Sequence, residues 1–432
     1  QHMVVHLLLE PVLDLRLSCR ERNMKNFNSY LIEQKNTHME HIEDNVLNGG
    51  VDGAREAINF LRSLRDMLSG DAKTTVDATV KWDGAPAVFA GIDPNDNKFF
   101  VAKKGIFNKN AKVYKTEADI DADTSGDLAD KLKAALQEFS KLGITGVIQG
   151  DLLFTKGDTK DITYNGVKHI TFHPNTIVYA VPKDSALGRQ IARARIGVVW
   201  HTTYTGDSFE TMSASFAKPI AQTLTETSRV FSTDAVYRDV SGKAMMTEKD
   251  TAAITAILSD AGKIFNKIDR ATLNGISDND ELLMRTKTFL NTKVRAGERM
   301  GNTTKLTKDL MQYLMDYFGK EEGKRKTEKG KSGVRGRQAS VMDYFTKTDS
   351  RKIKLIFDLM DKIVQAKEII IKKMDQAATI NTLLSTKDGY KVTGQEGFVA
   401  VDRMKGNAVK LIDRLQFSHA NFSADVKKGW QK

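Results

Sequence analysis

The sequence is poor in cysteine, with only Cys19 among its 432 residues. A single thiol can form neither an internal disulfide framework nor a cysteine-based zinc site, which fits a reducing cytoplasm. The sequence also lacks any apolar run near the roughly 20 residues that span a bilayer, and it carries no internal repeat. Its 40% apolar and 28% charged residues are typical of a soluble globular protein of two domains, or of one domain with a large insertion.

The N-terminus lacks the features of a secretory signal peptide. Its first three residues resemble a cloning scar, and the apolar stretch 4–17 leads into Arg20-Glu21-Arg22 instead of a small-residue cleavage site. We therefore expect residues 1–23 to be a non-native leader and Met24 to be the natural start. Cys19 then belongs to the leader and has no function.

Acidic residues are fewer than basic ones, 55 against 66, which gives a formal net charge of +11. This excess favours a polyanionic partner such as nucleic acid, although basic charge also occurs on surfaces that only face water. Residues 320–337 hold eight Lys or Arg against three Glu and are interrupted by four glycines. They are predicted to form a mobile basic loop, either a nucleic-acid contact or a solvated linker. Its candidate contacts are Lys324, Arg325, Lys326, Lys329, Lys331, Arg335 and Arg337.

Apolar periodicity divides the rest of the chain into helical and β regions. Residues 24–73 follow the helical spacing of three and four, and residues 74–205 contain several strands with two helices among them. Residues 206–387 are predicted to be almost entirely helical, and strands return in residues 388–432. The expected fold is therefore α+β, with an antiparallel sheet that the chain leaves for a helical insertion and later completes.

Lys81 occupies a position in which a lysine can act as a nucleophile. A protonated lysine is a poor nucleophile, so a catalytic one needs desolvation or neighbouring positive charge to lower its pKa. Lys81 ends a β run and is followed by Asp83 and Gly84, a turn whose backbone can approach a ligand closely. Taken alone, Lys-x-Asp-Gly also arises as an ordinary turn, so the structural and catalytic interpretations stand together at this point.

Five short motifs, in order, resemble the covalent nucleotidyltransferase superfamily of DNA ligases, RNA ligases and mRNA capping enzymes. Lys81-Trp82-Asp83-Gly84 resembles the first motif, whose lysine attacks the α-phosphate of ATP, forms a phosphoramidate and expels pyrophosphate. Lys103-Lys104-Gly105 resembles a basic motif after the next strand, which implies phosphate or ribose contact through Lys104. Gly150-Asp151 resembles the third motif, where the family usually has Glu, and a water can bridge the shorter side chain to ribose or metal.

The last two motifs lie near the end of the chain. Glu396-Gly397-Phe398-Val399 resembles the fourth motif, in which a carboxylate at the start of an apolar strand suits a hard divalent ion. Val409-Lys410-Leu411-Ile412 resembles the fifth, in which a basic residue touches the α-phosphate. The family commonly has a second lysine where Ile412 stands, and Arg414 or Lys405 can supply that charge. The resemblance implies that Lys81, Glu396 and Lys410 converge on one pocket.

The family also stacks an aromatic residue on the purine base. Tyr179 and Trp200 both fit this role, and each fits equally well as a core aromatic. Trp200 is slightly preferred, because polar His201 and Thr202 follow it directly. His38, His41 and Asp44 share one predicted helical face, whose spacing also allows a metal site. This face either is exposed or capping, or helps to cover the nucleotide or to grip phosphate. This segment resembles uncharacterised tailed-phage proteins with a ligase-like core.

The resemblance covers residues of about 75–204 and 388–415. It implies an antiparallel-sheet nucleotidyltransferase (ATP-grasp-like ligase) core and a nucleic-acid partner with 5′-phosphate and 3′-hydroxyl ends. It also implies ATP as the nucleotide and Mg²⁺ or Mn²⁺ bound by Asp151 and Glu396. Some twenty residues follow Lys410, which leaves no room for a C-terminal OB domain and favours an RNA-ligase-like protein, with RNA ends slightly preferred over nicked DNA.

Two other functions stay open on the sequence alone. The first is a nucleotidyltransferase that adenylylates an acceptor other than nucleic acid, and the second is a non-catalytic phage protein that binds nucleic acid. GTP in place of ATP and the oligomeric state are also open. The expected location is the cytoplasm of an infected bacterium, with no membrane attachment and no obligate protein partner.

Overall fold

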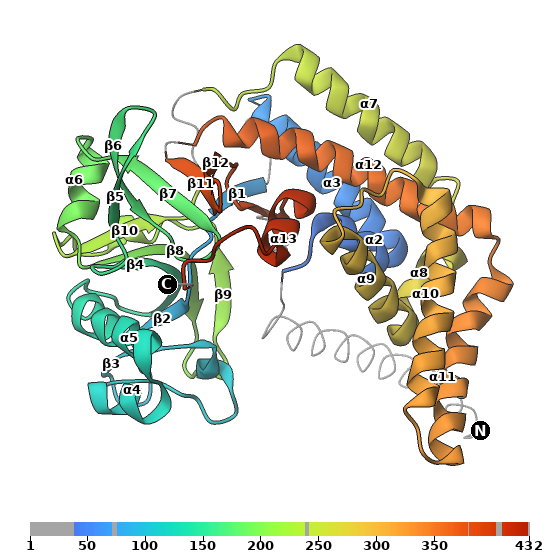
Figure 1. The fold of residues 1–432 in the computed structure, drawn as a ribbon, viewed down its shortest axis with the longest axis horizontal. Coiled ribbons are helices and arrows are strands. Elements are labelled where there is room, and N and C mark those ends of the chain that lie inside the picture. Colours follow the sequence, from blue (N-terminus) through green and yellow to red (C-terminus); the bar gives the residue numbers. More distant parts are fainter. Residues whose placement is uncertain (1–38, 71–75, 238–241, 379, 403–407, 431–432) are drawn as a thin grey trace, which may run out of the picture.

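The computed structural model describes residues 39–70, 76–237, 242–378, 380–402 and 408–430. A β region and a helical region lie side by side (Figure 1), and the molecule has the α+β class that the sequence predicts, with 47% helix and 23% strand. Within the described residues, no helix combines the length and apolarity needed to cross a membrane. The predicted leader, Cys19, Met24, His38 and Lys405 lie outside the described residues.

A six-stranded sheet forms the centre of the β region. Its order is β10-β8-β4-β2-β3 with β9 joined to β8, and every pair is antiparallel except β10 with β8. The helices α4 (Glu117–Asp123) and α5 (Gly126–Phe139) contribute to a core on one face of the sheet. The strands are β2 (Ala87–Ile92), β3 (Phe99–Ala102), β4 (Val147–Thr155), β8 (Ile196–Thr205), β9 (Ser213–Phe216) and β10 (Val230–Asp234).

A five-stranded antiparallel sheet packs near the first, in the order β12-β11-β7-β6-β5. Phe154, Phe172 and Val199 belong to the core shared by the two sheets, to which α6 (Ala186–Arg193) also contributes. β11 joins this sheet after the chain has left the helical region. The strands are β5 (Lys160–Tyr164), β6 (Val167–Phe172), β7 (Ile177–Pro182), β11 (Asn381–Thr386) and β12 (Gly389–Val392).

A third sheet joins the early and late parts of the chain. β1 (Val76–Lys81) and β14 (Ala408–Leu411) flank β13 (Gly397–Asp402), and both pairs are antiparallel. Side chains alternate between the two faces of a strand. One face, which includes Ala78 and Phe398, is buried against the helical region. Residues that are opposite in an antiparallel pair share a face, so the other face carries Lys81 and Lys410, whose register partners are both on β13.

The helical region is built from helices near the start of the described chain and from helices of its second half, which pack together. The short helices η1 (Ile42–Asp44) and α2 (Asn45–Asn48) and the longer α3 (Gly50–Leu68) share one apolar core with the late helices. The late helices are α7 (Glu248–Phe265), α8 (Arg270–Ser277), α9 (Asp280–Arg295), α10 (Thr303–Gly323), α11 (Glu328–Lys347) and α12 (Ser350–Asp375).

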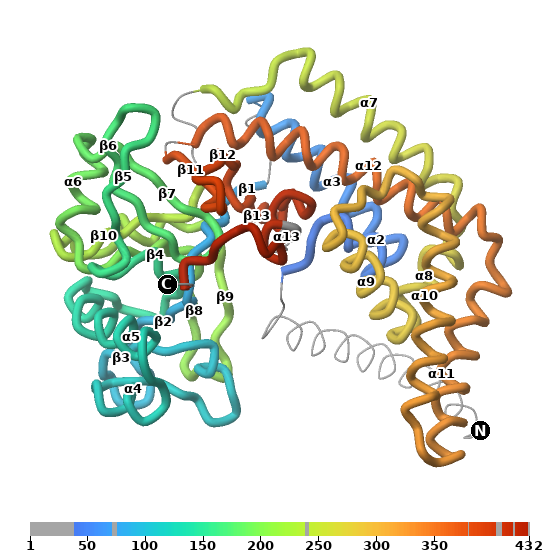
Figure 2. The backbone as a smooth tube through the Cα atoms, in the orientation of Figure 1, coloured from blue at the N-terminus to red at the C-terminus, as the bar shows by residue number. Residues whose placement is uncertain are grey.

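The boundaries of the predicted helical insertion, 206–387, need correction. β9 and β10 follow position 206 and add to the six-stranded sheet, and β11 begins at Asn381. The helical part therefore runs from Glu248 to Asp375. The last helix, α13 (Arg414–Phe422), lies between the helical and β regions (Figure 2).

The basic segment 320–337 is a helical hairpin and not the mobile loop that its glycines predict. α10 ends at Gly323, and α11 begins after Thr327, whose side chain accepts a hydrogen bond from the backbone N–H of Gly330. Burial of Val334 anchors α11 in the helical core and outweighs the low helix propensity of glycine. The tip of the hairpin lies at the end of the helical region that is distant from the sheets (Figure 1).

Candidate active site

Lys81 and Glu396 meet at adjoining ends of β1 and β13. The register pairs Lys81 with Gly397, and Lys81 Nζ lies 2.5 Å from Glu396 Oε2. Gly397 has a φ of +154°, and a Cβ on it would lie 2.4 Å from the carbonyl oxygen of Leu411. Only glycine therefore allows β14 to pass this close to the start of β13.

The protonation of this pair differs from the sequence expectation of a lowered lysine pKa. Burial alone would lower the pKa of Lys81, but the carboxylates of Glu396, Asp151 and Asp83 outweigh it and raise that pKa above its ordinary value. Burial raises the pKa of Glu396 to about 7, although Lys81 opposes the shift. Without a nucleotide, Lys81 is therefore held as an ammonium beside a carboxyl group that titrates near neutral pH.

Asp83 holds the turn after Lys81 and does not face open space. Its carboxylate accepts hydrogen bonds from Asn175 Nδ2 at 2.6 Å, and from the backbone N–H groups of Thr176 and Ile177 at 2.6 and 2.7 Å. The side chain is almost fully buried, with 4% of Asp83 exposed. These contacts, the Asp83 latch, fasten the turn to the start of β7. They correct the prediction that Asp83 binds the nucleotide.

Gly84 allows the same turn to pack directly on β4. A Cβ at this position would lie 2.6 Å from Asp151 Cβ and 3.0 Å from the carbonyl oxygen of Leu152, both too short for an ordinary contact. Ala85 N–H donates to that same carbonyl oxygen at 2.9 Å. The predicted close approach of the Gly84 backbone is therefore to the strand that carries Asp151, and it sets the position of Asp151 relative to Lys81.

A β-bulge places His201 beside Asp151. Gln149 pairs with Thr202 and Gly150 pairs with Trp200, so His201 is the extra residue on β8. His201 Nε2 lies 3.7 Å from Asp151 Oδ2, and the ring stays partly exposed. Sequence alternation gives no sign of such a bulge, and this residue was missed.

Both predicted base-stacking aromatics are buried, which corrects both predictions. Trp200 belongs to the core that α5 shares with the sheet, 5.2 Å from the Phe139 ring, and its Nε1–H donates to Ser232 Oγ. Tyr179 is fully buried, and its hydroxyl accepts the backbone N–H of Asp83 at 2.7 Å. Neither ring has a free face for a purine.

Lys410 and Lys104 bring further positive charge to Lys81. Burial lowers the pKa of Lys410, and the nearby charges of Lys81 and Lys104 lower it further. Lys410 forms no side-chain ion pair with any residue in the described ranges. Lys104 begins the 3-10 helix η2 (Lys104–Phe107) and is exposed, whereas Lys103 pairs with Asp123 at 3.0 Å. Of the two adjacent lysines, Lys104 adds to the positive charge around Lys410.

The second basic residue of the fifth motif is absent for a packing reason. Ile412 is buried in the core between the two larger sheets. Arg414 does not replace it, because its guanidinium lies 3.2 Å from Asp44 and 3.7 Å from Glu43. The prediction that Arg414 supplies this charge is therefore corrected.

The segment that carries His41 is buried and not an exposed helix face. His41 precedes η1 in an extended conformation, and its neighbour Glu40 accepts the backbone N–H of Lys410 at 2.9 Å. Burial lowers the pKa of His41 to about 3. Glu43 forms an ion pair with Lys367 at 2.8 Å, and both side chains are 1 to 2% exposed. A buried charged cluster thus supports the strand that carries Lys410.

Asp151 and Glu396 are the carboxylates available to a divalent ion. Among the residues that the structure describes, no group of three or more His, Cys, Asp or Glu is arranged to hold a metal. Mg²⁺ commonly uses one or two carboxylates together with water and substrate phosphates. The two carboxylates near Lys81 fit that mode of binding, and they do not fit a closed metal site made by protein alone.

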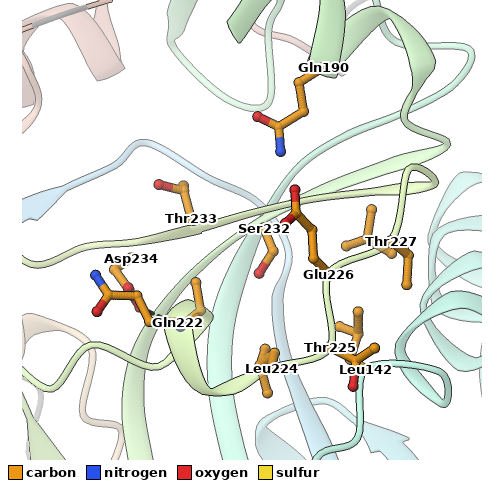
Figure 3. A pocket seen from close by; sticks show the side chains of 12 residues that line it. Leu142, Gln190, Gln222, Leu224, Thr225, Glu226, Thr227, Ser232, Thr233 and Asp234 are labelled. Carbon is orange, nitrogen blue, oxygen red and sulfur yellow. Dashed lines mark hydrogen bonds between the residues drawn. The ribbon is translucent and has the colours of Figure 1, made fainter. Parts of the chain in front are cut away.

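A separate pocket of about 340 Å³ adjoins the edge strand β10 (Figure 3). Leu142 and Val230 connect it to the core beneath α5. None of the predicted site residues lines it, and its lining contains neither lysine nor arginine. It therefore offers no cation to a phosphate group, and we place the site at Lys81.

The fold and the site define an α+β protein with a lysine and carboxylate centre. The chain belongs to a protein family described as a family of unknown function (DUF6267), whose model matches residues 36–427. No curated protein matches the chain. No solved structure matches it either.

Proposed function

We propose that the protein is an ATP-dependent covalent nucleotidyltransferase of the polynucleotide ligase type, with Lys81 as the nucleophile. The observation that carries this proposal is the 2.5 Å contact between Lys81 and Glu396, beside Asp151 and within reach of the charge of Lys410. These residues come from separate motifs whose order resembles that of the ligase superfamily. Their grouping supports a single nucleotide site between the strands that carry them.

The first step forms a lysyl-AMP. Lys81 Nζ attacks the α-phosphorus of ATP, an N–P bond forms, and the P–O bond to the leaving pyrophosphate breaks. Lys81, an ammonium before the reaction, must lose one proton before its lone pair can attack and a second as the N–P bond forms. Glu396 Oε2, already in contact with Nζ, accepts the first proton, and the departing pyrophosphate accepts the second. With a pKa of about 7, the Glu396 carboxylate is matched to proton transfer near neutral pH.

The phosphate charge is balanced by the lysines around this pair. Lys410 lacks a carboxylate partner in the described structure, and Lys104 is exposed, so both are available to phosphate oxygens. Mg²⁺ or Mn²⁺ held by Asp151 would neutralise further charge on the phosphates, and Glu396 would join the metal only after it has passed on the proton from Lys81. With Tyr179 and Trp200 buried, we assign the contact with the ribose or base to His201, the partly exposed ring beside Asp151.

The AMP then passes to a 5′-phosphate, and a 3′-hydroxyl displaces it to seal the strand. The proposed acceptor is nucleic acid, with RNA ends favoured over nicked DNA. The net charge of +11 supports such a partner. The exposed cations of the α10–α11 hairpin are a second source of nucleic-acid contact, although Glu321 pairs with both Lys324 and Arg325.

The test is transfer of label from ATP to protein. The protein is incubated with Mg²⁺ and ATP labelled at either the α- or the γ-phosphate, then separated on a denaturing gel. We expect label from the α-phosphate only, and none in Lys81→Ala. Lys104→Ala should label poorly, whereas Lys103→Ala is the matched control because Lys103 faces Asp123.

Two results count against the proposal. Absence of label in the wild-type protein, with ATP and with GTP, would reject a covalent nucleotidyltransferase, and persistence of label in Lys81→Ala would reject the assigned nucleophile. Nicked DNA, nicked RNA and single-stranded RNA offered to the labelled protein then identify the acceptor. Stable label that passes to none of them would favour an acceptor other than nucleic acid.

A further inference from the structure

Two exposed aromatic side chains follow the proposed site in the C-terminal segment. Phe422, at the end of α13, is 61% exposed, and Trp430 is 63% exposed. Most large aromatic residues of the described structure are buried or half-buried. Because these two rings stay in water, the folded state does not gain the stabilisation that their burial would provide. Exposed aromatic rings of this kind are a feature of binding surfaces.

The segment that carries these rings is tied to the proposed site at both ends. α13 begins directly after β14, the strand of Lys410. Further along, Gly429 N–H donates to the carbonyl oxygen of Asn175 at 2.7 Å, and Asn175 is part of the Asp83 latch. Phe422 and Trp430 are therefore held on a segment that borders the nucleotide site.

The ring of Phe422 lies next to a positively charged side chain. The guanidinium carbon of Arg295 lies 4.4 Å from the centroid of Phe422, within cation–π distance. Arg295 shares a face of α9 with Asn291 and Lys287, because the three are spaced at four residues. Asn291 accepts a hydrogen bond from Arg414 at the start of α13. Lys287 pairs with Glu40 at 2.9 Å. The α9–α13 surface thus combines an exposed ring, a guanidinium stacked on it and the amide of Asn291.

We infer that the α9–α13 surface, with Trp430 beyond it, is the docking site of the single-stranded end of a nucleic acid, whose bases stack on Phe422 and Trp430. This inference rests on the proposed function, which supplies the reason for binding nucleic acid. It adds the part of the molecule that binds the acceptor strand. Aromatic rings with nearby cations bind single strands without sequence preference, because every base has a stacking face.

The α10–α11 hairpin fits this role less well. Its cations lie beside glutamates, as with Arg335, which contacts both Glu322 and Glu328. Tyr344 is buried in the helical core, and Tyr313 and Tyr317 of α10 are only partly exposed. Among the described residues, no aromatic ring of the hairpin is as exposed as Phe422 or Trp430. The hairpin also lies on the side of the helical region that is distant from the β region (Figure 1).

The test is binding of fluorescein-labelled single-stranded RNA and DNA to the full chain, followed by fluorescence anisotropy. We expect Phe422→Ala and Trp430→Ala each to weaken Kd by roughly tenfold, the loss of one base-stacking contact. Phe422→Tyr should bind as the wild type does, because it keeps the ring. Tyr164→Ala is the matched control, since Tyr164 is partly exposed and lies on β5, at the opposite edge of the five-stranded sheet from β12.

Two outcomes overturn the inference. One is unchanged binding in both ring variants while a triple variant of the hairpin, Lys326→Ala with Lys329→Ala and Lys331→Ala, loses binding. The other is a wild-type protein that binds none of the oligonucleotides. Lysyl-AMP formation by the wild type, measured without nucleic acid, tests the proposed function separately, so failure of one result does not imply failure of the other. Melting curves identify any ring variant that is unfolded.

Discussion

Substitution of Asp83 distinguishes between two roles for this residue, which are to fasten the turn after Lys81 and to contact the nucleotide. The variant Asp83→Ala leaves the backbone N–H groups of Thr176 and Ile177 without their acceptor, and both residues are at most 1% exposed. An unsatisfied buried donor costs about 1–3 kcal/mol, so the two together should lower the free energy of unfolding by roughly 2–6 kcal/mol. The Asn175 amide is only partly buried and can turn to water, so it adds little.

The measurement is urea-induced unfolding followed by tryptophan fluorescence, for which Trp82 is a reporter next to the latch. Hydrogen exchange of the peptide that contains Thr176 and Ile177 gives the local effect. Asp83→Asn is the matched control, because its amide oxygen can still accept from both N–H groups, and we expect it to lose less than half as much stability. If both variants are as stable as the wild type while ATP binding weakens, Asp83 contacts the nucleotide and the latch is refuted.

Three further predictions concern the surroundings of Lys81. Gly84→Ala places a Cβ 2.6 Å from Asp151 Cβ and should slow single-turnover adenylylation about 100-fold. Gly157→Ala, with open space around it, is the control and should leave the rate unchanged. Equal rates in the two variants would disprove the close packing at Gly84. Because burial raises the pKa of Glu396 to about 7, adenylylation should fall as pH drops below that value, and Glu396→Gln should slow it by roughly 10²–10⁴-fold and abolish this dependence; a wild-type profile that is flat from pH 6 to 8 would contradict the proton transfer. Lys367→Met leaves the buried Glu43 carboxylate without its partner and should lower the free energy of unfolding, measured by thermal denaturation, by about 3–5 kcal/mol. Adding Glu43→Gln should restore part of this stability. A double variant no more stable than Lys367→Met would show that the pair is not coupled.

The sequence predicted the parts of the site that depend on motif order. The spacing of Lys81-Trp82-Asp83-Gly84 and Glu396-Gly397 places both motifs at strand ends, and the structure brings them together through β1 and β13. After the helices the chain returns to the β region, where β11 to β14 join two of the sheets. These features follow from local patterns that tertiary packing did not override.

Other features depend on contacts that a single sequence does not reveal. The partners of Asp83 lie near position 176, and the bulge at His201 breaks the alternation on which strand faces are predicted. Trp200 faces the α5 core because of that register. In segment 320–337 the glycines indicated a loop, but burial of Val334 in the helical core holds the segment as a helix.

The central claim is that Lys81 carries the nucleotide as a phosphoramidate, and peptide mapping by mass spectrometry tests it most directly. After incubation with ATP and Mg²⁺, a single AMP adduct should map to Lys81, disappear in acid and survive alkali, as a phosphorus–nitrogen bond to lysine requires. An adduct on any other residue, or an unmodified Lys81 under conditions in which ATP binds, would contradict the account.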